Sequence, residues 1–176
     1  MPIIRPSRDE DISAIVAIYA QQVREGTGTF ELDVPSEAEM ATRRADVLAK
    51  GLPYLVAQIG QQVVGFAFCT WFKPRPAYRF SAEDSIYLSP QAQGTGLGRA
   101  LLTELVARAE TVGIRKLIAV IGDSGNAGSI GVHRSVGFAP VGVLKSCGWK
   151  FDQWLDVVLM ERALGMGDAV PPASGR

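Results

Sequence analysis

A glycine-rich turn that leads directly into a helix is the feature that most restricts the fold of this chain. Residues 86–90 (IYLSP) form an apolar strand, and residues 93–102 (QGTGLGRALL) place glycines at alternate positions before an amphipathic helix. Glycine removes the Cβ atoms that would keep a ligand from the backbone, and the first N–H groups of a helix have no partner within it. The turn is therefore predicted to bind an anion, with phosphate or pyrophosphate as the natural occupant.

Two better-known phosphate-binding loops do not fit this turn. A Walker A loop ends in Gly-Lys-Ser/Thr, whereas this one ends in Gly98-Arg99-Ala100 and so lacks the lysine and the hydroxyl. A dinucleotide fingerprint has the spacing G-x-G-x-x-G after an early strand, whereas the spacing here is G-x-G-x-G in mid-chain. A P-loop and a Rossmann site are both disfavoured. A turn whose glycines serve only strand–helix packing is the alternative interpretation.

The rest of the chain alternates helix and strand patterns that are typical of an α/β fold. Helices are expected after the capping boxes Ser7-x-x-Glu10 and Ser36-x-x-Glu39, the second ending at Gly51. Strands are expected at residues 3–4, 54–59, 63–72, 80–89, 116–121, 141–147 and 154–162. Two of these strands alternate with helices in a β-α-β-α series, which predicts that strands 80–89 and 116–121 are adjacent and parallel.

Length and charge limit the classes of function. A chain of 176 residues fits one domain, which we place at residues 1–163, and the Gly, Pro and Ser content of residues 164–176 predicts a disordered tail. Eighteen basic and eighteen acidic residues cancel, so no nucleic-acid partner is expected. No apolar stretch approaches the ~20 residues of a membrane span, which favours a cytoplasmic protein. With one histidine and two cysteines without ligand spacing, no metal site is expected.

Four segments carry a resemblance to a known family. The pattern Gln-x-x-Gly-x-Gly after a strand ending in proline resembles the acetyl-CoA motif of the GNAT acyltransferase superfamily, and residues 126–138 (NAGSIGVHRSVGF) resemble its second CoA segment. Residues 77–87 (AYRFSAEDSIY) and 150–157 (KFDQWLDV) are similar to segments of the phosphinothricin and methionine sulfoximine/sulfone N-acetyltransferases. The resemblance runs from about Ile3 to Met160. It implies a mixed, twisted central β-sheet flanked by helices, with acetyl-CoA bound between splayed parallel strands.

The resemblance and the turn together predict which residues bind acetyl-CoA. Main-chain groups of Tyr87, Leu88 and Ser89 would meet the pantetheine arm and the thioester carbonyl. The pyrophosphate would lie on the backbone of Gly94, Thr95, Gly96, Leu97, Gly98 and Arg99. Asn126 and Ser135 are expected to hydrogen-bond the pantetheine chain; the alternatives are helix capping by Asn126 and a solvated helix face for Ser135.

Acetylation of an amine needs a base and an acid, and each has one candidate. The resemblance places the family's proposed base at Glu83, where partial burial and neighbouring Asp84 would raise the carboxyl pKa. The alternative is a solvated carboxylate or a partner for Arg79. His133 falls where many GNAT enzymes carry a tyrosine that protonates the leaving thiolate, and imidazole can do the same. The alternative is a packed or surface histidine.

An acceptor site is predicted beside Glu83. A short cationic loop contains Lys73, Arg75, Tyr78 and Arg79, and Phe30 and Trp71 could form walls of the pocket. The planar guanidinium of arginine can bind a carboxylate or an oxidised sulfur or phosphorus group through two hydrogen bonds. This loop is therefore the best candidate in the chain to bind the anionic groups of an acceptor. The alternatives are a solvated basic loop and aromatic side chains that belong to the core.

The activity implied by the resemblance is acetyl-CoA-dependent N-acetylation of a small amino acid, such as L-phosphinothricin, methionine sulfoximine or methionine sulfone. Transfer would be direct, without an acyl-enzyme. The resemblance also implies a homodimer in which residues 150–154 contribute to a shared pocket. Two alternatives stay open: a GNAT enzyme acting on another amine (an aminoglycoside, a polyamine or a protein terminus), and a non-catalytic module that binds acetyl-CoA.

Overall fold

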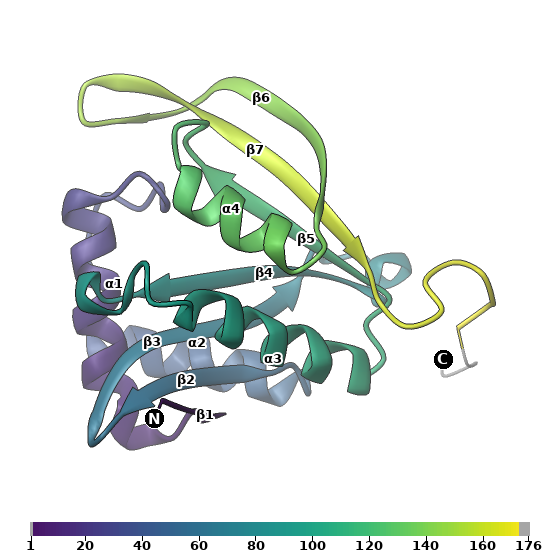
Figure 1. Ribbon diagram of the computed structural model, residues 1–176, viewed down its shortest axis with the longest axis horizontal. Helices are drawn as coiled ribbons and strands as arrows, with labels where there is room; N and C mark the ends of the chain where they lie inside the picture. The colour runs from purple at the N-terminus through teal and green to yellow at the C-terminus, as the bar shows by residue number, and fades with distance from the viewer. Residues whose placement is uncertain (1, 173–176) are drawn as a thin grey trace.

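The computed structural model describes residues 2–172 as one seven-stranded sheet with helices on both faces (Figure 1). The strands lie in the order β1-β2-β3-β4-β5-β7-β6. Their bounds are β1 (Ile3–Pro6), β2 (Tyr54–Ile59), β3 (Gln62–Trp71), β4 (Ser81–Leu88), β5 (Lys116–Gly122), β6 (Ala139–Lys150) and β7 (Gln153–Ala163). Strands β4 and β5 pair in parallel and the other neighbours pair antiparallel, which confirms the predicted mixed sheet.

In residues 2–172, four α-helices cover the sheet. They are α1 (Ile12–Glu25), α2 (Glu37–Ala49), α3 (Leu97–Thr111) and α4 (Ala127–Ser135). In Figure 1, α3 and α4 lie on the near face of the sheet, and α2 lies behind it. Helices α1, α2 and α3 each bury apolar side chains, such as Leu101, Leu102 and Leu105 of α3, whereas the one buried side chain of α4 is His133. The core therefore has two layers, one on each side of β2 to β5.

One of the two predicted capping boxes is wrong. Ser36 does cap α2, because its hydroxyl accepts the N–H of Glu39 at 3.1 Å. Ser7 does not cap α1: its hydroxyl accepts from Nε of Arg44 at 2.7 Å. The chain enters α1 through a 3₁₀ turn at Asp9–Asp11, where the carboxylate of Asp11 accepts the N–H of Arg8 at 2.7 Å.

The disorder predicted from residue 164 onward does not apply to the start of that segment. Leu164 is 2% exposed and its N–H donates to the carbonyl of Arg115 at 2.9 Å. The guanidinium of Arg115 in turn donates to the carbonyl of Gly167 at 3.3 Å. The globular unit therefore continues past residue 163, while residues 173–176 of the predicted tail lie outside the described residues.

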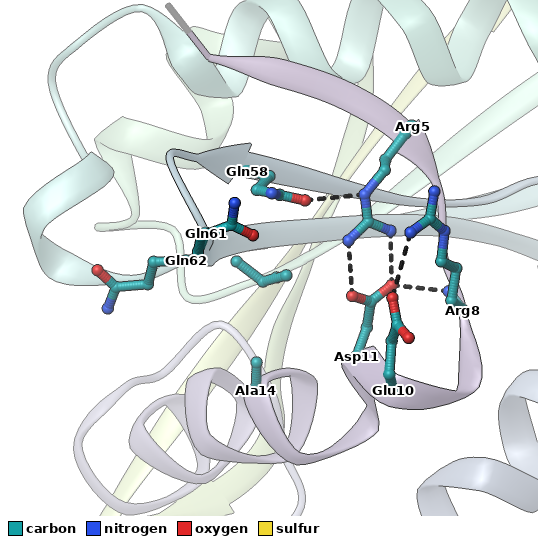
Figure 2. A pocket seen from close by; sticks show the side chains of 9 residues that line it. Arg5, Arg8, Glu10, Asp11, Ala14, Gln58, Gln61 and Gln62 are labelled. Carbon is teal, nitrogen blue, oxygen red and sulfur yellow. Dashed lines mark hydrogen bonds and ion pairs between the residues drawn. The ribbon is translucent and has the colours of Figure 1, made fainter.

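A polar cavity of about 410 Å³ lies at the β1 end of the sheet. Figure 2 shows that Arg5 points at Asp11, and its guanidinium donates to both carboxylate oxygens at 2.8 Å and to Gln58 at 2.9 Å. The exposed Arg8 pairs with Glu10 at 3.2 Å. These charges satisfy one another and anchor the first strand. The residues predicted to act in catalysis or binding lie elsewhere.

Candidate active site

A second cavity lies where β4 and β5 separate. The two strands are paired from Ser81 and Lys116 as far as Asp84 and Ala119, and they diverge beyond that point. A cavity of about 350 Å³ fills the gap. It is lined from both faces of the sheet, by Gln22, Gly28, Ser85 and Tyr87 on the α1 side and by Asp84, Ile86, Leu88, Val132 and His133 on the α4 side. A ligand in this gap is therefore reachable from both faces.

Hydrogen bonds to β3 decide which main-chain groups of β4 are free. At the two ends of the β3–β4 pairing, the N–H of Ser89 donates to the carbonyl of Val64 at 2.9 Å and the N–H of Phe72 donates to the carbonyl of Ser81 at 3.2 Å. The register between these bonds is continuous. Because antiparallel pairs alternate between bonded and non-bonded, the odd-numbered residues of β4 point their main-chain groups at β3.

The main-chain groups that face the cavity therefore belong to Ile86 and Leu88. Leu88 agrees with the sequence-based prediction. The groups of Tyr87 and Ser89 are used within the sheet, so the prediction that they serve a ligand is corrected. Ile86 takes their place, and only the strand register could have identified it.

The glycines of the turn have two different roles. Gly94 and Gly96 have left-handed backbones, with φ of 71° and 85°, and a Cβ added at either would meet no atom within 4 Å. Gly96 is also the N-cap of α3. A Cβ on Gly98 would instead lie 3.2 Å from Leu88 and 3.4 Å from Val132. The first two positions leave open space for a ligand, whereas Gly98 lets α3 pack closely on β4 and α4.

The other turn residues divide between surface and core. Arg99 is exposed and lines the cavity, so its cation faces the open side of the turn. The hydroxyl of Thr95 donates to the carbonyl of Ala92 at 2.7 Å, which fixes the turn. Leu97 is buried in the core and can offer a ligand only its main-chain N–H.

Of the two residues at α4 that were predicted to contact the pantetheine chain, Asn126 lines the cavity and Ser135 does not. Asn126 lines the cavity, and its side-chain oxygen accepts the N–H of Ser129 at 3.1 Å, so it also caps α4. Ser135 is exposed, lies outside the cavity lining, and donates to the carbonyl of Val132 at 2.7 Å. Contact between Ser135 and the pantetheine chain stays a prediction.

His133 lines the cavity and forms a buried pair with Asp84. Its Nε2 lies 2.9 Å from Oδ2 of Asp84, and its Nδ1 lies 2.7 Å from the carbonyl oxygen of Ser129. Burial lowers the pKa of His133, but the hydrogen bond and the charge of Asp84 outweigh burial, so the net pKa is raised. The sequence alone did not indicate this pair, because its members are 49 residues apart.

Glu83 is half-buried and lies on the opposite face of β4 from Asp84, because side chains alternate along a strand. Burial, followed by the charge of Asp84, raises the pKa of Glu83, and Lys73 opposes this. Glu83 does not line the cavity, and its role as the base stays a prediction. Arg79, the partner in the alternative interpretation, instead lies over the ring of Phe80 at 4.6 Å.

The predicted anion clamp is a separate surface loop. Lys73, Arg75, Tyr78 and Arg79 are all exposed, and none of them lines the cavity between β4 and β5. Tyr78 packs edge-on against Phe72, with ring centroids 5.8 Å apart. Trp71, at the end of β3, is also exposed. The structure therefore does not bring these residues to the cavity, and their contact with an acceptor stays a prediction.

Phe30 is held in a slot between two glycines. A Cβ on Gly122 would lie 3.0 Å from its ring, and a Cβ on Gly148 would lie 2.2 Å from it. The ammonium of Lys150, only 3% exposed, donates to the carbonyls of Gly26 at 2.7 Å and Thr29 at 2.8 Å. The segment between α1 and α2 is thus fastened to the β6–β7 hairpin. Phe30 anchors this segment, in addition to any role as a pocket wall.

Two classes of site can be addressed directly from the described residues. Between residues 2 and 172 no helix is long and apolar enough to cross a bilayer. Within the same range, no group of three His, Cys, Asp or Glu side chains is arranged to hold a metal ion.

Known proteins resemble the chain over nearly its full length. Phosphinothricin N-acetyltransferase of Alcaligenes faecalis is 52% identical, covering 96% of this chain and 86% of that protein. L-methionine sulfoximine/L-methionine sulfone acetyltransferase of Pseudomonas aeruginosa is 35% identical, covering 96% and 98%. The crystal structure of a GNAT superfamily phosphinothricin acetyltransferase from Sinorhizobium meliloti, in complex with acetyl-CoA, matches with a TM-score of 0.96 and 44% identity over 99% of this chain and 94% of that one.

A family model agrees with these relatives. Residues 16–138 match the acetyltransferase (GNAT) family, and this range contains the glycine turn, the separation of β4 from β5, and the Asp84–His133 pair. The expected fold is confirmed by the structural match. The chain belongs to the acetyltransferase (GNAT) family.

Proposed function

We propose that this chain transfers the acetyl group of acetyl-CoA to the α-amino group of a small amino acid, such as L-phosphinothricin, methionine sulfoximine or methionine sulfone. The observation that carries the proposal is the cavity between β4 and β5, with the open glycine turn beside it. The two named relatives act on these amino acids, and the solved relative holds acetyl-CoA.

The cavity residues fit the needs of acetyl-CoA. Gly94 and Gly96 leave the N-terminus of α3 unobstructed for the pyrophosphate, and Arg99 adds a cation. Main-chain groups of Ile86 and Leu88 face the gap and suit the amides of the pantetheine arm. Acetyl-CoA, when bound, supplies the activated acetyl group.

Transfer is direct, because the cavity joins the two faces of the sheet. The thioester and the amine can then meet without an enzyme nucleophile, and the nearby thiol, Cys69, is buried with its pKa raised by burial and by Asp84. Glu83 takes the amine proton, directly or through water, since its raised pKa makes it a stronger base than an ordinary carboxylate. His133 stabilises the departing thiolate and orients its protonation.

A thiol-release assay over a panel of acceptors tests the proposal. Methionine sulfoximine, methionine sulfone and L-phosphinothricin should release coenzyme A far faster than spermidine, an aminoglycoside or a peptide. The reverse preference would favour the alternative that this GNAT enzyme acetylates another kind of amine. Acetyl-CoA binding without acetylation of any acceptor would favour the non-catalytic module.

We further propose that the chain acts as a homodimer in the cytoplasm, where acetyl-CoA is available. Support for a dimer comes from the β6–β7 hairpin, whose apolar side chains are exposed, among them Val141, Val143, Trp149 and Trp154. Burying such a patch against a second copy would remove apolar area from water. Sedimentation of the purified protein and fractionation of the source cells test the two statements.

A further inference from the structure

Asp84 and His133 form a buried hydrogen-bonded pair at the edge of the cavity. The side chains are 5% and 2% exposed, and Nε2 lies 2.9 Å from Oδ2. A carbonyl oxygen can only accept, so Nδ1, at 2.7 Å from the carbonyl of Ser129, carries a hydrogen. A second proton must then lie between Nε2 and Oδ2, because two lone pairs would otherwise face each other.

The carboxylate of Asp84 acts only through this histidine. Its other oxygen, Oδ1, is buried and has no hydrogen-bond partner among residues 2–172. With less than 1 Å² of exposed surface, that oxygen is closed to a ligand as well as to solvent. His133 is therefore the group that compensates the charge of Asp84.

Among residues 2–172, no other charged side chain replaces His133 in this role. On β3 the residue opposite Asp84 is Cys69, a fully buried thiol whose pKa is raised, so it stays neutral. On β5 the paired residue is the apolar Ala119. The neighbouring carboxyl, Glu83, projects from the opposite face of β4. The charge state of His133 therefore depends on Asp84 more than on any other side chain among residues 2–172.

We propose that Asp84 is a positioning residue that keeps His133 doubly protonated through neutral pH, so that the positive charge of the imidazolium stabilises the leaving thiolate. The inference rests on the proposed acetyl transfer. In that step the amine nitrogen bonds to the acetyl carbon, and the C–S bond breaks with its electrons on sulfur. The positive imidazolium, with both N–H groups held by Asp84 and Ser129, stabilises the thiolate, which takes its proton from solvent. The amine proton passes to Glu83, which returns it to solvent before the next turnover.

The single histidine of the sequence makes a direct test possible. Protein labelled with ¹⁵N-histidine gives one pair of ring nitrogens, whose NMR shifts report protonation and tautomer from about pH 5 to pH 9. In the wild type both nitrogens should stay protonated past neutral pH. In Asp84→Asn, which keeps the shape but cannot hold the proton, the transition should fall by at least about one pH unit and leave the Nδ1–H tautomer at neutral pH.

Kinetics with a matched neighbour distinguish positioning from mere structure. In Asp84→Asn the alkaline limb of kcat should move to lower pH by the displacement seen in the NMR titration, with the KM for acetyl-CoA within about twofold. Glu83→Gln, one residue away on the other face, should lower kcat and leave the titration of His133 in place. A displaced limb in Asp84→Asn alone supports the proposal.

Three results would overturn the proposal. One is a wild-type His133 that is neutral at pH 7, a measurement that needs no variant and holds even if Asp84→Asn does not fold. Another is the same transition in both proteins. The third is a fall in kcat without any shift of the pH profile. If no acceptor is acetylated, the NMR titration still decides the state of the pair, so failure of the proposed function is seen separately.

Discussion

Glu83 and Asp84 are adjacent in the chain, yet their carboxyl groups lie on opposite faces of the sheet. Asp84 points toward α4, where it meets His133 at 2.9 Å, and Glu83 points toward the side of α1 and α2. The backbone of one strand thus separates the candidate base, Glu83, from the carboxylate that pairs with His133.

Replacing the base should slow catalysis without unfolding the protein. Glu83→Gln is expected to lower kcat/KM by about 10²–10⁴-fold at neutral pH. Raising the pH should recover part of the loss, because more of the acceptor is then already deprotonated. Because the pKa of Glu83 is raised, the acid limb of the wild-type pH–rate profile should also lie above the ordinary carboxyl range. Wild-type rates for Glu83→Gln across the profile, with acetyl-CoA saturating, would make Glu83 a structural carboxylate.

Obstructing the glycine turn should weaken acetyl-CoA binding. Gly96→Val puts a branched side chain into the open space before α3 and should cost at least tenfold in affinity, about 1.4 kcal/mol. Gly113→Val is the matched control, since Gly113 has a φ of 90°, is equally open, and follows the other end of α3. Both variants share the backbone strain, and calorimetry should show weaker binding for Gly96→Val alone. Equal affinities for the two would remove the turn from the cosubstrate site.

The surface loop should affect the acceptor and not the cosubstrate. If Arg75 clamps the acceptor's anionic groups, Arg75→Ala should raise the acceptor KM several-fold and leave acetyl-CoA binding nearly unchanged. Arg8→Ala, at the cavity beside β1, serves as the control for loss of an exposed cation. Steady-state kinetics with methionine sulfoximine provide the measurement. An unchanged acceptor KM would leave this loop as a solvated surface.

Stability should fall above neutral pH because of His133. A raised pKa in the folded state means that the pair's contribution is complete below the unfolded histidine pKa of about 6.5. The contribution is lost as the pH rises through the raised folded value. Urea unfolding at a series of pH values should show this decline in the wild type and not in His133→Phe. If the unfolding free energies of the wild type and His133→Phe changed with pH in the same way, the charge of His133 would not contribute to the stability of the fold.

The slot for Phe30 should not tolerate a methyl group. Gly148→Ala would bring a Cβ within 2.2 Å of the ring, and overpacking of this kind typically costs about 1–3 kcal/mol of unfolding free energy. The double variant with Phe30→Ala should lose less than the sum of the two single variants. Additive losses in chemical denaturation would mean that the ring leaves the slot freely.

Local signals predicted more of this protein than long-range ones. The cap at Ser36 involves a residue three positions away, so it could be predicted from spacing. The box at Ser7 failed because Arg44, 37 positions away, takes the hydroxyl. Leu164 was assigned to a disordered tail because its neighbours are Gly, Pro and Ser, yet a contact with Arg115 holds it in the core. Tertiary partners override local preference at such positions.

The candidate site follows the same division. The glycine turn and the β-α-β series are local patterns, and the two strands of the series do pair in parallel, with a cavity where they separate. The partner of His133 is 49 residues away and could not be identified from spacing. The choice of Ile86 over Tyr87 depends on the register between two strands, which a single strand's sequence does not contain.

The separation of β4 from β5 also has a thermodynamic consequence. Beyond Asp84 and Ala119, β4 and β5 no longer form hydrogen bonds with each other. The sheet there lacks the stabilisation that paired strands provide elsewhere. A ligand that hydrogen-bonds to both strands across the gap would supply the missing contacts, and it would stabilise the folded chain in proportion to the logarithm of its concentration. The bound cosubstrate would therefore contribute to the stability of the sheet, and each turnover would replace the molecule that makes this contribution.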